Sequence, residues 1–134
     1  MAKQNGLGYS IVIDNSAGVA KTISNDITNF QFATPRGVQD VTGVDKSAME
    51  RILLLADFSI TLNLVFNTTT DMSHDIFKDV TSTSVGRTTV LTVSAKAMTA
   101  EVLYTDYPIS RSNSGELTAA VPGVLQNGVA PAWS

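Results

Sequence analysis

The feature that most restricts the fold of this chain is an alternation of apolar and polar side chains over residues 58–66. The apolar set occupies every second position and consists of Phe58, Ile60, Leu62, Leu64 and Phe66. The positions between them hold Ser59, Thr61, Asn63 and, as the one exception, Val65. Successive side chains of a β-strand point to opposite faces, so this pattern predicts a strand with one buried face. A helix would scatter the same five side chains around its circumference.

Further strands are predicted along the chain, separated by turn-forming residues. They cover residues 9–14 and 19–24, which form a hairpin, and residues 27–33, 87–95, 99–105 and 116–121. One helix is predicted over residues 71–80, where Met72, Ile76 and Val80 recur every four residues and Asp71 or Ser73 can cap the N-terminus. Many short strands with one helix predict a mainly β fold, a β-sandwich or partly closed barrel with a flanking helix.

Composition restricts the function as well as the fold. A chain of 134 residues predicts a single domain over residues 1–134. Its net charge is −3 with no basic cluster, which argues against DNA binding through phosphate neutralisation. Charged residues make up only 16% of the chain, as is typical of a surface that meets other subunits.

No membrane or export signal is recognisable in the sequence. The apolar runs at residues 52–56 and 62–66 are far shorter than the roughly 20 residues of a membrane span. Residues 1–6 lack the apolar stretch of a secretory signal.

Catalytic and metal-binding chemistry finds little support in the residue types. The chain has no Cys, one His and no G-x-S-x-G pattern. His74 lies in the predicted helix with Asp71, Asp75 and Asp79, a spacing typical of a solvated helix face. We therefore expect no enzyme, no cofactor and no metal site.

Two segments do not fit a compact sandwich. Residues 34–57 form a long connection with both signs of charge that turns apolar at residues 52–55, and such connections are usually functional. Residues 123–134 contain two Gly, one Pro and the only Trp of the chain, Trp133, which predicts that this tail docks on a surface. Both segments are interpreted as arms for a partner.

The same region carries a resemblance to a known family. Residues 40–60 read D-V-T-G-V-D-K-S-A-M-E-R-I-L-L-L-A-D-F-S-I. This run resembles the D-V-T-(short polar loop)-E-R-x-x-x-L-x-D-x-S segment of major tail tube proteins of phages with long, non-contractile tails. The closing V-P-G at residues 121–123 and G-V-A-P-A-W at residues 128–133 are also similar, so the resemblance covers roughly residues 8–133.

The resemblance implies a structural virion protein, assembled in the host cytoplasm and located in the phage tail. Six subunits would close a ring whose inner strands form one continuous barrel, and stacked rings would form a tube around a tape-measure protein. The tube would end at tail-end proteins and conduct double-stranded DNA during genome ejection without binding it. Residues 34–55 would be the stacking loop, and residues 1–7 and 123–134 the N- and C-terminal arms.

These expectations assign two sets of residues. The ring-stacking or subunit interface is expected to contain Asp40, Val41, Thr42, Asp45, Lys46, Glu50, Arg51, Ile52, Leu53, Leu54, Leu55, Pro131 and Trp133. The lumen, which should be neutral or acidic so that it does not hold DNA, is expected to expose Thr61, Asn63, Glu101, Glu116 and Thr118. Deleting residues 38–46 should leave folded subunits that no longer form tubes.

Three other functions remain open at this point. A head decoration or tail-terminator protein would form a closed oligomer in place of a polymer. A carbohydrate- or ligand-binding β-sandwich module would need an exposed aromatic platform, for which Tyr104, Tyr107 and Trp133 are the candidates. A hydrolase has the least support.

Overall fold

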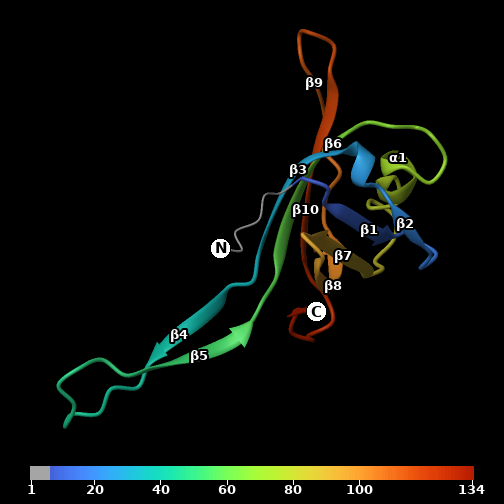
Figure 1. The fold of residues 1–134 in the computed structure, drawn as a ribbon. Coiled ribbons are helices and arrows are strands. Elements are labelled where there is room, and N and C mark those ends of the chain that lie inside the picture. Colours follow the sequence, from blue (N-terminus) through green and yellow to red (C-terminus); the bar gives the residue numbers. More distant parts are fainter. Residues whose placement is uncertain (1–6) are drawn as a thin grey trace.

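The computed structural model describes residues 7–134. Residues 1–6, which make up nearly all of the expected N-terminal arm, lie outside the described residues. The described chain is mainly β, as the alternation patterns predict, with one large sheet, a separate two-stranded ribbon and one short α-helix (Figure 1).

The large sheet has nine strands, seven of which follow the order β2-β1-β7-β8-β10-β6-β3, while β9 pairs with β10 and β11 pairs with β8. Their bounds are β1 Ser10–Asp14, β2 Ala20–Thr22, β3 Ile27–Ala33, β6 Ser59–Val65, β7 Arg87–Val93, β8 Lys96–Tyr104, β9 Ile109–Arg111, β10 Leu117–Leu125 and β11 Ala132–Trp133. The ribbon consists of β4 (Arg36–Asp40) and β5 (Arg51–Ala56). Every pairing in both sheets is antiparallel.

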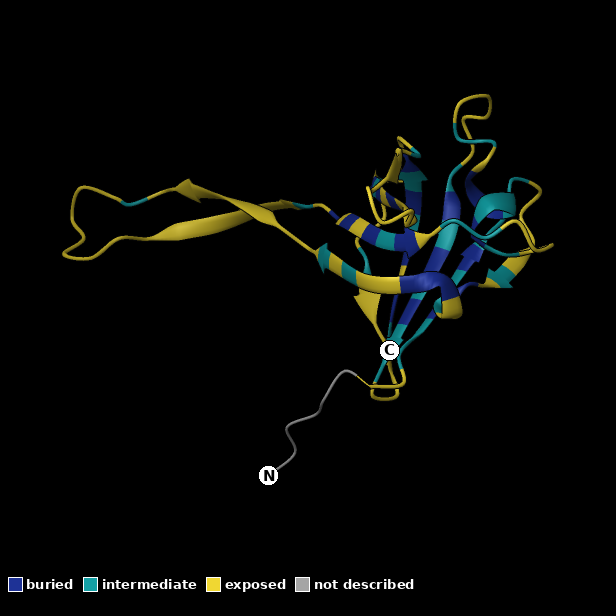
Figure 2. Cartoon of the chain, turned by 90° about the horizontal axis from the view of Figure 1, so that it is seen from above, coloured by how far each residue is buried: buried dark blue, intermediate teal, exposed yellow. Residues whose placement is uncertain are grey.

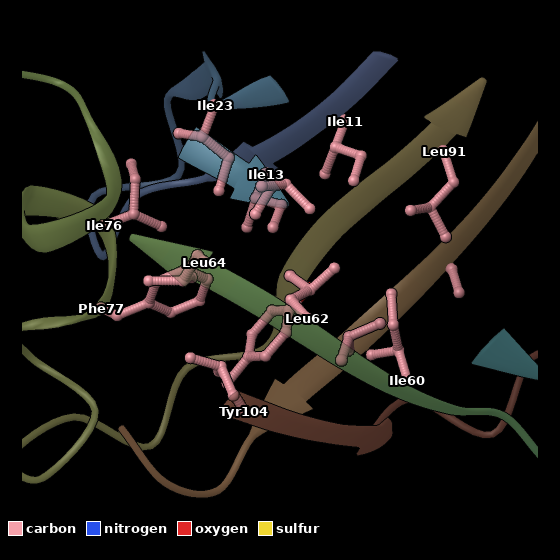
Figure 3. Packing of buried hydrophobic residues seen from close by; sticks show 14 of the residues in the cluster. Ile11, Ile13, Ile23, Ile60, Leu62, Leu64, Ile76, Phe77, Leu91 and Tyr104 are labelled. Carbon is pink, nitrogen blue, oxygen red and sulfur yellow. The ribbon is translucent and has the colours of Figure 1, made fainter. Parts of the chain in front are cut away.

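The large sheet curls around its own apolar face to form the core (Figure 3). Ile60, Leu62 and Leu64 of β6 are buried against side chains from β1, β7 and β8, as the period-two pattern predicts. At the open edge, the Tyr9 hydroxyl donates to the Ile27 carbonyl and the Tyr9 ring packs on Phe30, with 5.1 Å between ring centroids. The result is the expected partly closed sandwich.

Several strand ends differ from the prediction, and two of these differences are instructive. β7 ends at Val93 because Ser94 and Ala95 have positive φ angles (51° and 66°) and form a two-residue hairpin turn into β8. β10 runs past Pro122 to Leu125, so the first residues of the expected C-terminal arm belong to the sheet. The Pro122 carbonyl still accepts the Thr105 N–H at 3.2 Å, so the missing donor of the proline does not end the strand.

The helix is shorter than predicted, since α1 covers only Ser73–Phe77. Asp71 has a φ of 65°, so the chain before the helix is not helical. After Lys78 the pattern tightens, because the Val80 N–H donates to the carbonyl three residues back, at Phe77. Neither Asp71 nor Ser73 caps the helix with its side chain. Ile76 and Phe77 are buried in the core, as expected of an apolar stripe.

Candidate functional site

The most prominent feature of the molecule is the β4–β5 ribbon, which projects from the body as a long hairpin (Figures 1 and 2). It lies between β3 and β6, so the segment expected to be a long connection is a β-hairpin that extends these two strands beyond the sheet. All residues of β4 are exposed, and so are those of β5 up to Leu55. A lone two-stranded ribbon is only marginally stable in water, so this hairpin is suited to gain stability from a partner.

Both faces of the hairpin carry exposed apolar side chains. Val38 pairs with Leu53 on one face, and Ile52 lies on the other together with Leu54, whose Cδ1 lies 3.3 Å from the position that a Cβ on Gly37 would take. A register shift gives β5 one extra residue near its end, and there Leu55 is 91% exposed. Apolar side chains exposed on both sides of a ribbon favour contact with a partner molecule over contact with water.

The tip of the hairpin is held by polar contacts within the turn. The Asp40 carboxylate accepts the Thr42 hydroxyl (2.6 Å) and the Thr42 N–H (2.9 Å), and these hydrogen bonds hold the pKa of Asp40 below its usual value. The Thr42 hydroxyl oxygen accepts the Glu50 N–H at 2.8 Å, closing the loop. Thr42 is therefore an organising residue of the turn as well as an expected interface residue.

The charged side chains of the hairpin have no ion-pair partner within residues 7–134, where the two salt bridges join Lys21 to Asp71 and Lys78 to Asp75. These unpaired hairpin charges are Arg36, Asp40, Asp45, Lys46, Glu50 and Arg51. Three are basic and three acidic, so they cancel. They are free to pair with charges on another molecule.

A second surface is the outward face of β3, β6 and β10, which we name the uncharged sheet face. The strand register places on it Asn29, Gln31, Ala33, Ser59, Thr61, Asn63, Val65, Thr118, Ala120, Pro122 and Val124. All are exposed except Asn63 and Pro122, which are half-buried. None carries a charge, and the Asn63 amide donates to the Asn29 side-chain oxygen across the strands.

The structure brings together three of the five residues expected at the lumen. Thr61, Asn63 and Thr118 lie on the uncharged sheet face. Glu101 lies on the neighbouring strand β8, on the same side of that strand as Leu103, which pairs with Val124. Its carboxylate accepts the Thr88 hydroxyl at 2.7 Å beside residues 127–130. Glu116 precedes β10 and accepts the Ser112 hydroxyl at 2.7 Å in the turn of the β9–β10 hairpin.

The C-terminal segment folds back on the body. β11 pairs with β8 at the positions that β10 leaves free, matching Ala132 with Thr99 and Trp133 with Met98. The Trp133 ring contacts Phe32 at a centroid distance of 5.7 Å and remains 56% exposed. Pro131 is half-buried just before it, and Ala130 lines a groove with Arg36 and residues 53–56 at the base of the hairpin. The two expected interface segments therefore meet at this groove.

The helix side of the molecule holds a buried polar cluster that the sequence patterns do not reveal. Asp26 is buried and accepts the Ser73 N–H at 3.0 Å and the Asn67 side-chain amide at 2.9 Å. Asp26 thus caps α1 from a distant part of the chain, in the role predicted for Asp71 or Ser73. Nearby, the His74 ring lies between Phe66 and Tyr107.

Within the described residues no group of His, Cys, Asp and Glu side chains is arranged to hold a metal ion. Over the same residues no helix is long and apolar enough to cross a membrane.

Comparison with known proteins places the fold. No family model and no curated protein matches the sequence. A chain from the virion of a native gene transfer agent particle superposes with a TM-score of 0.76 at 15% identity, covering 98% of this chain and 99% of that one. A chain from the tail of an empty gene transfer agent particle, solved by helical refinement with C6 symmetry, gives a TM-score of 0.78 at 17% identity over 98% of both chains. The chain therefore has, over nearly its whole length, a fold found in the virion and the tail of gene transfer agent particles.

Proposed function

We propose that this chain is the structural subunit of a phage-like tail tube, in which hexameric rings stack into a conduit for DNA. The observation that carries the proposal is the match to a chain of a C6-symmetric helical tail over 98% of both chains. The protein has no catalytic role in this proposal. Its site is an assembly surface, located in the virion, with tape-measure and tail-end proteins as partners.

The uncharged sheet face is proposed as the wall of the conduit. In the single chain β3 is a terminal strand of the sheet order, and β9 pairs only with β10 among the described strands, so both present a free backbone edge. Pairing such edges around a ring would remove them, as closure of any β-barrel does. DNA would then pass along uncharged hydroxyl and amide groups. Because these groups do not neutralise phosphates, they displace no counterions from the DNA and do not hold it.

The hairpin is proposed as the stacking element between rings. Burying one exposed Leu side chain stabilises a contact by about 1.5–3 kcal/mol. Residues 39–52 of the hairpin expose four large apolar side chains, Val41, Val44, Met49 and Ile52, in addition to those of residues 53–55. Solvated charge pairs add about 0–1 kcal/mol each. The apolar side chains therefore supply most of the affinity, and the tip charges supply register.

Negative-stain microscopy of the purified protein tests the proposal, with open-ended tubes as the expected result. In the matched variant, residues 39–52 are replaced by Asn-Gly, which joins the paired residues Val38 and Leu53 through a two-residue turn. This change is cleaner than deleting residues 38–46, which would leave β5 without a partner. We expect circular dichroism and thermal unfolding like those of the wild type, and no tubes.

Other outcomes contradict the proposal. Tubes of normal length from the shortened variant would exclude residues 39–52 of the hairpin as the stacking element. Isolated rings from the wild type would indicate a terminator protein. Wild-type monomers with sugar affinity would indicate a binding module.

A further inference from the structure

We propose that the β9–β10 hairpin carries the surface that receives the β4–β5 hairpin of a second copy in the next ring. This inference rests on the proposed tube and identifies the acceptor, which is the surface that binds the β4–β5 hairpin of the neighbouring ring. We name the acceptor the receiving patch and define it as Ile109, Arg111 and Leu117.

The receiving patch lies on one face of a ladder. Leu117 pairs with Arg111 and Ala119 pairs with Ile109, so these four side chains point to the same side of the β9–β10 pair. Ala119 is buried in the core, whereas Ile109 and Leu117 are 42% and 38% exposed. The patch therefore continues the core face of β10 beyond the point where the body covers it.

The receiving patch and the β4–β5 hairpin lie at opposite ends of the molecule. In Figure 1 the β4–β5 hairpin leaves one end of the β3–β6–β10 layer, and the β9–β10 hairpin rises from the other end. If this layer lines the conduit, the two hairpins belong to the two opposite surfaces of a ring.

In a tube of identical stacked rings, the two opposite surfaces of a ring must differ from each other and be complementary. A surface that binds its own copy closes after one contact and gives a pair of rings, whereas an open polymer needs a contact between two different surfaces. The β4–β5 hairpin is the donor surface of such a contact. Ile109 and Leu117 are exposed apolar side chains of the β9–β10 hairpin, which lies at the far end of the layer in Figure 1.

The chemistry of the two surfaces agrees with this assignment. Both expose aliphatic side chains from a two-stranded ladder, which allows them to pack flat against each other. The charges of the β4–β5 hairpin cancel, so apolar contact drives the association and Arg111 contributes register. We therefore expect tube formation to change little between low and moderate salt.

The first test substitutes single residues. Ile109→Lys and Leu117→Lys, made separately, should each raise the protein concentration needed for tube formation by about tenfold or more, which corresponds to about 1.4 kcal/mol or more. Val85→Lys is the matched control, because Val85 is also a large exposed apolar residue but lies in the loop after α1. Thermal unfolding verifies that each variant is folded. If the Leu117→Lys variant does not fold, the Ile109→Lys variant alone provides the test.

The second test mixes two defective chains. The chain with residues 39–52 replaced by Asn-Gly keeps its receiving patch, and the Ile109→Lys chain keeps its β4–β5 hairpin. At a concentration at which the wild type forms tubes and the Ile109→Lys chain does not, neither chain should form tubes alone. Together they should form a finite complex containing both chains, detected by size-exclusion chromatography with light scattering.

The outcomes separate this inference from the proposed function. Wild-type tubes together with normal tubes from Ile109→Lys and Leu117→Lys would overturn the receiving patch and leave the proposed function intact. Defective single chains that form no mixed complex would also overturn it. A wild-type protein that forms no tubes would overturn both.

Discussion

Gly123 shows how closely the strands approach one another in this fold. It pairs with Ile60 of β6 on one side and Tyr104 of β8 on the other, so it lies where β10 enters between two strands. A Cβ at this position would lie 2.5 Å from Val102 Cγ1 and 3.0 Å from Ile60 Cγ2. Tyr104 is fully enclosed beside it, and this burial raises the pKa of its hydroxyl well above the usual value.

Gly123→Ala should lower the free energy of unfolding by about 1–3 kcal/mol, because the added methyl group overpacks a core that cannot yield. Urea denaturation followed by circular dichroism measures the change. Gly37→Ala is the matched control, since its Cβ would meet only the flexible end of Leu54 in the exposed hairpin. Equal stability of the wild type and Gly123→Ala would show that the backbone relaxes at this crossing.

At the scale of elements, the helix depends on a residue outside it. Asp26 belongs to η1 (Ser24–Asp26) and accepts the N–H of Ser73, the first residue of α1. The Ser73 hydroxyl in turn donates to the Val65 carbonyl at 2.9 Å. Since α1 has only five residues, tertiary contacts such as these hold it in place more than helix propensity does.

Asp26→Ala should therefore destabilise the protein by about 1–3 kcal/mol, because it leaves the buried Ser73 N–H and the Asn67 amide without their acceptor. It should also increase hydrogen exchange in residues 73–77, measured by mass spectrometry. Asp71→Asn is the control: it removes an exposed ion pair with Lys21 at 3.3 Å, worth about 0–1 kcal/mol, and Asn tolerates the positive φ of residue 71. An equal effect of the two substitutions would contradict a capping role for Asp26.

The elements also show what the sequence can and cannot predict. β6 was predictable because its two faces differ in polarity, and an apolar–polar period of two indicates a β-strand. The β4–β5 hairpin was not recognised as a ribbon, because residues 52–55 are apolar on both faces and have no period. Asp26 as a cap was missed because it lies 47 residues from Ser73 in the chain.

The expected lumen residues show the same limit. Alternation along single strands identified Thr61, Asn63 and Thr118 as polar outward positions, and the register places them on one face. The same reasoning grouped Glu101 and Glu116 with them, and their place in the lumen stays a prediction. Alternation gives the face within a strand, but it does not give the hydrogen bonds that join Glu101 to Thr88 and Glu116 to Ser112.

At the scale of the whole molecule, the proposed wall predicts how a tube treats DNA. The double variant Thr61→Lys and Asn63→Lys would place twelve cations around each six-subunit ring. These tubes should bind double-stranded DNA with an affinity that falls steeply with salt, whereas wild-type tubes should not bind. Fluorescence anisotropy with a short labelled duplex measures this.

The control for this experiment is Ser82→Lys with Thr83→Lys, which adds the same charge in the turn after α1, away from the uncharged sheet face. A short duplex that bound both double variants equally would place residues 61 and 63 outside the conduit. Preferential retention by the Thr61→Lys and Asn63→Lys tubes would support the wall assignment.

The uncharged sheet face has one more physical consequence. Its side chains are hydroxyl, amide, proline and aliphatic groups, none of which gains or loses a proton between roughly pH 4 and pH 10. Acidification or alkalisation therefore leaves the electrostatic potential contributed by this face unchanged. Its amides and hydroxyls both donate and accept hydrogen bonds, so the face retains a layer of water. A molecule moving along it would slide over that water and meet the same surface in an acidic medium as in a neutral one.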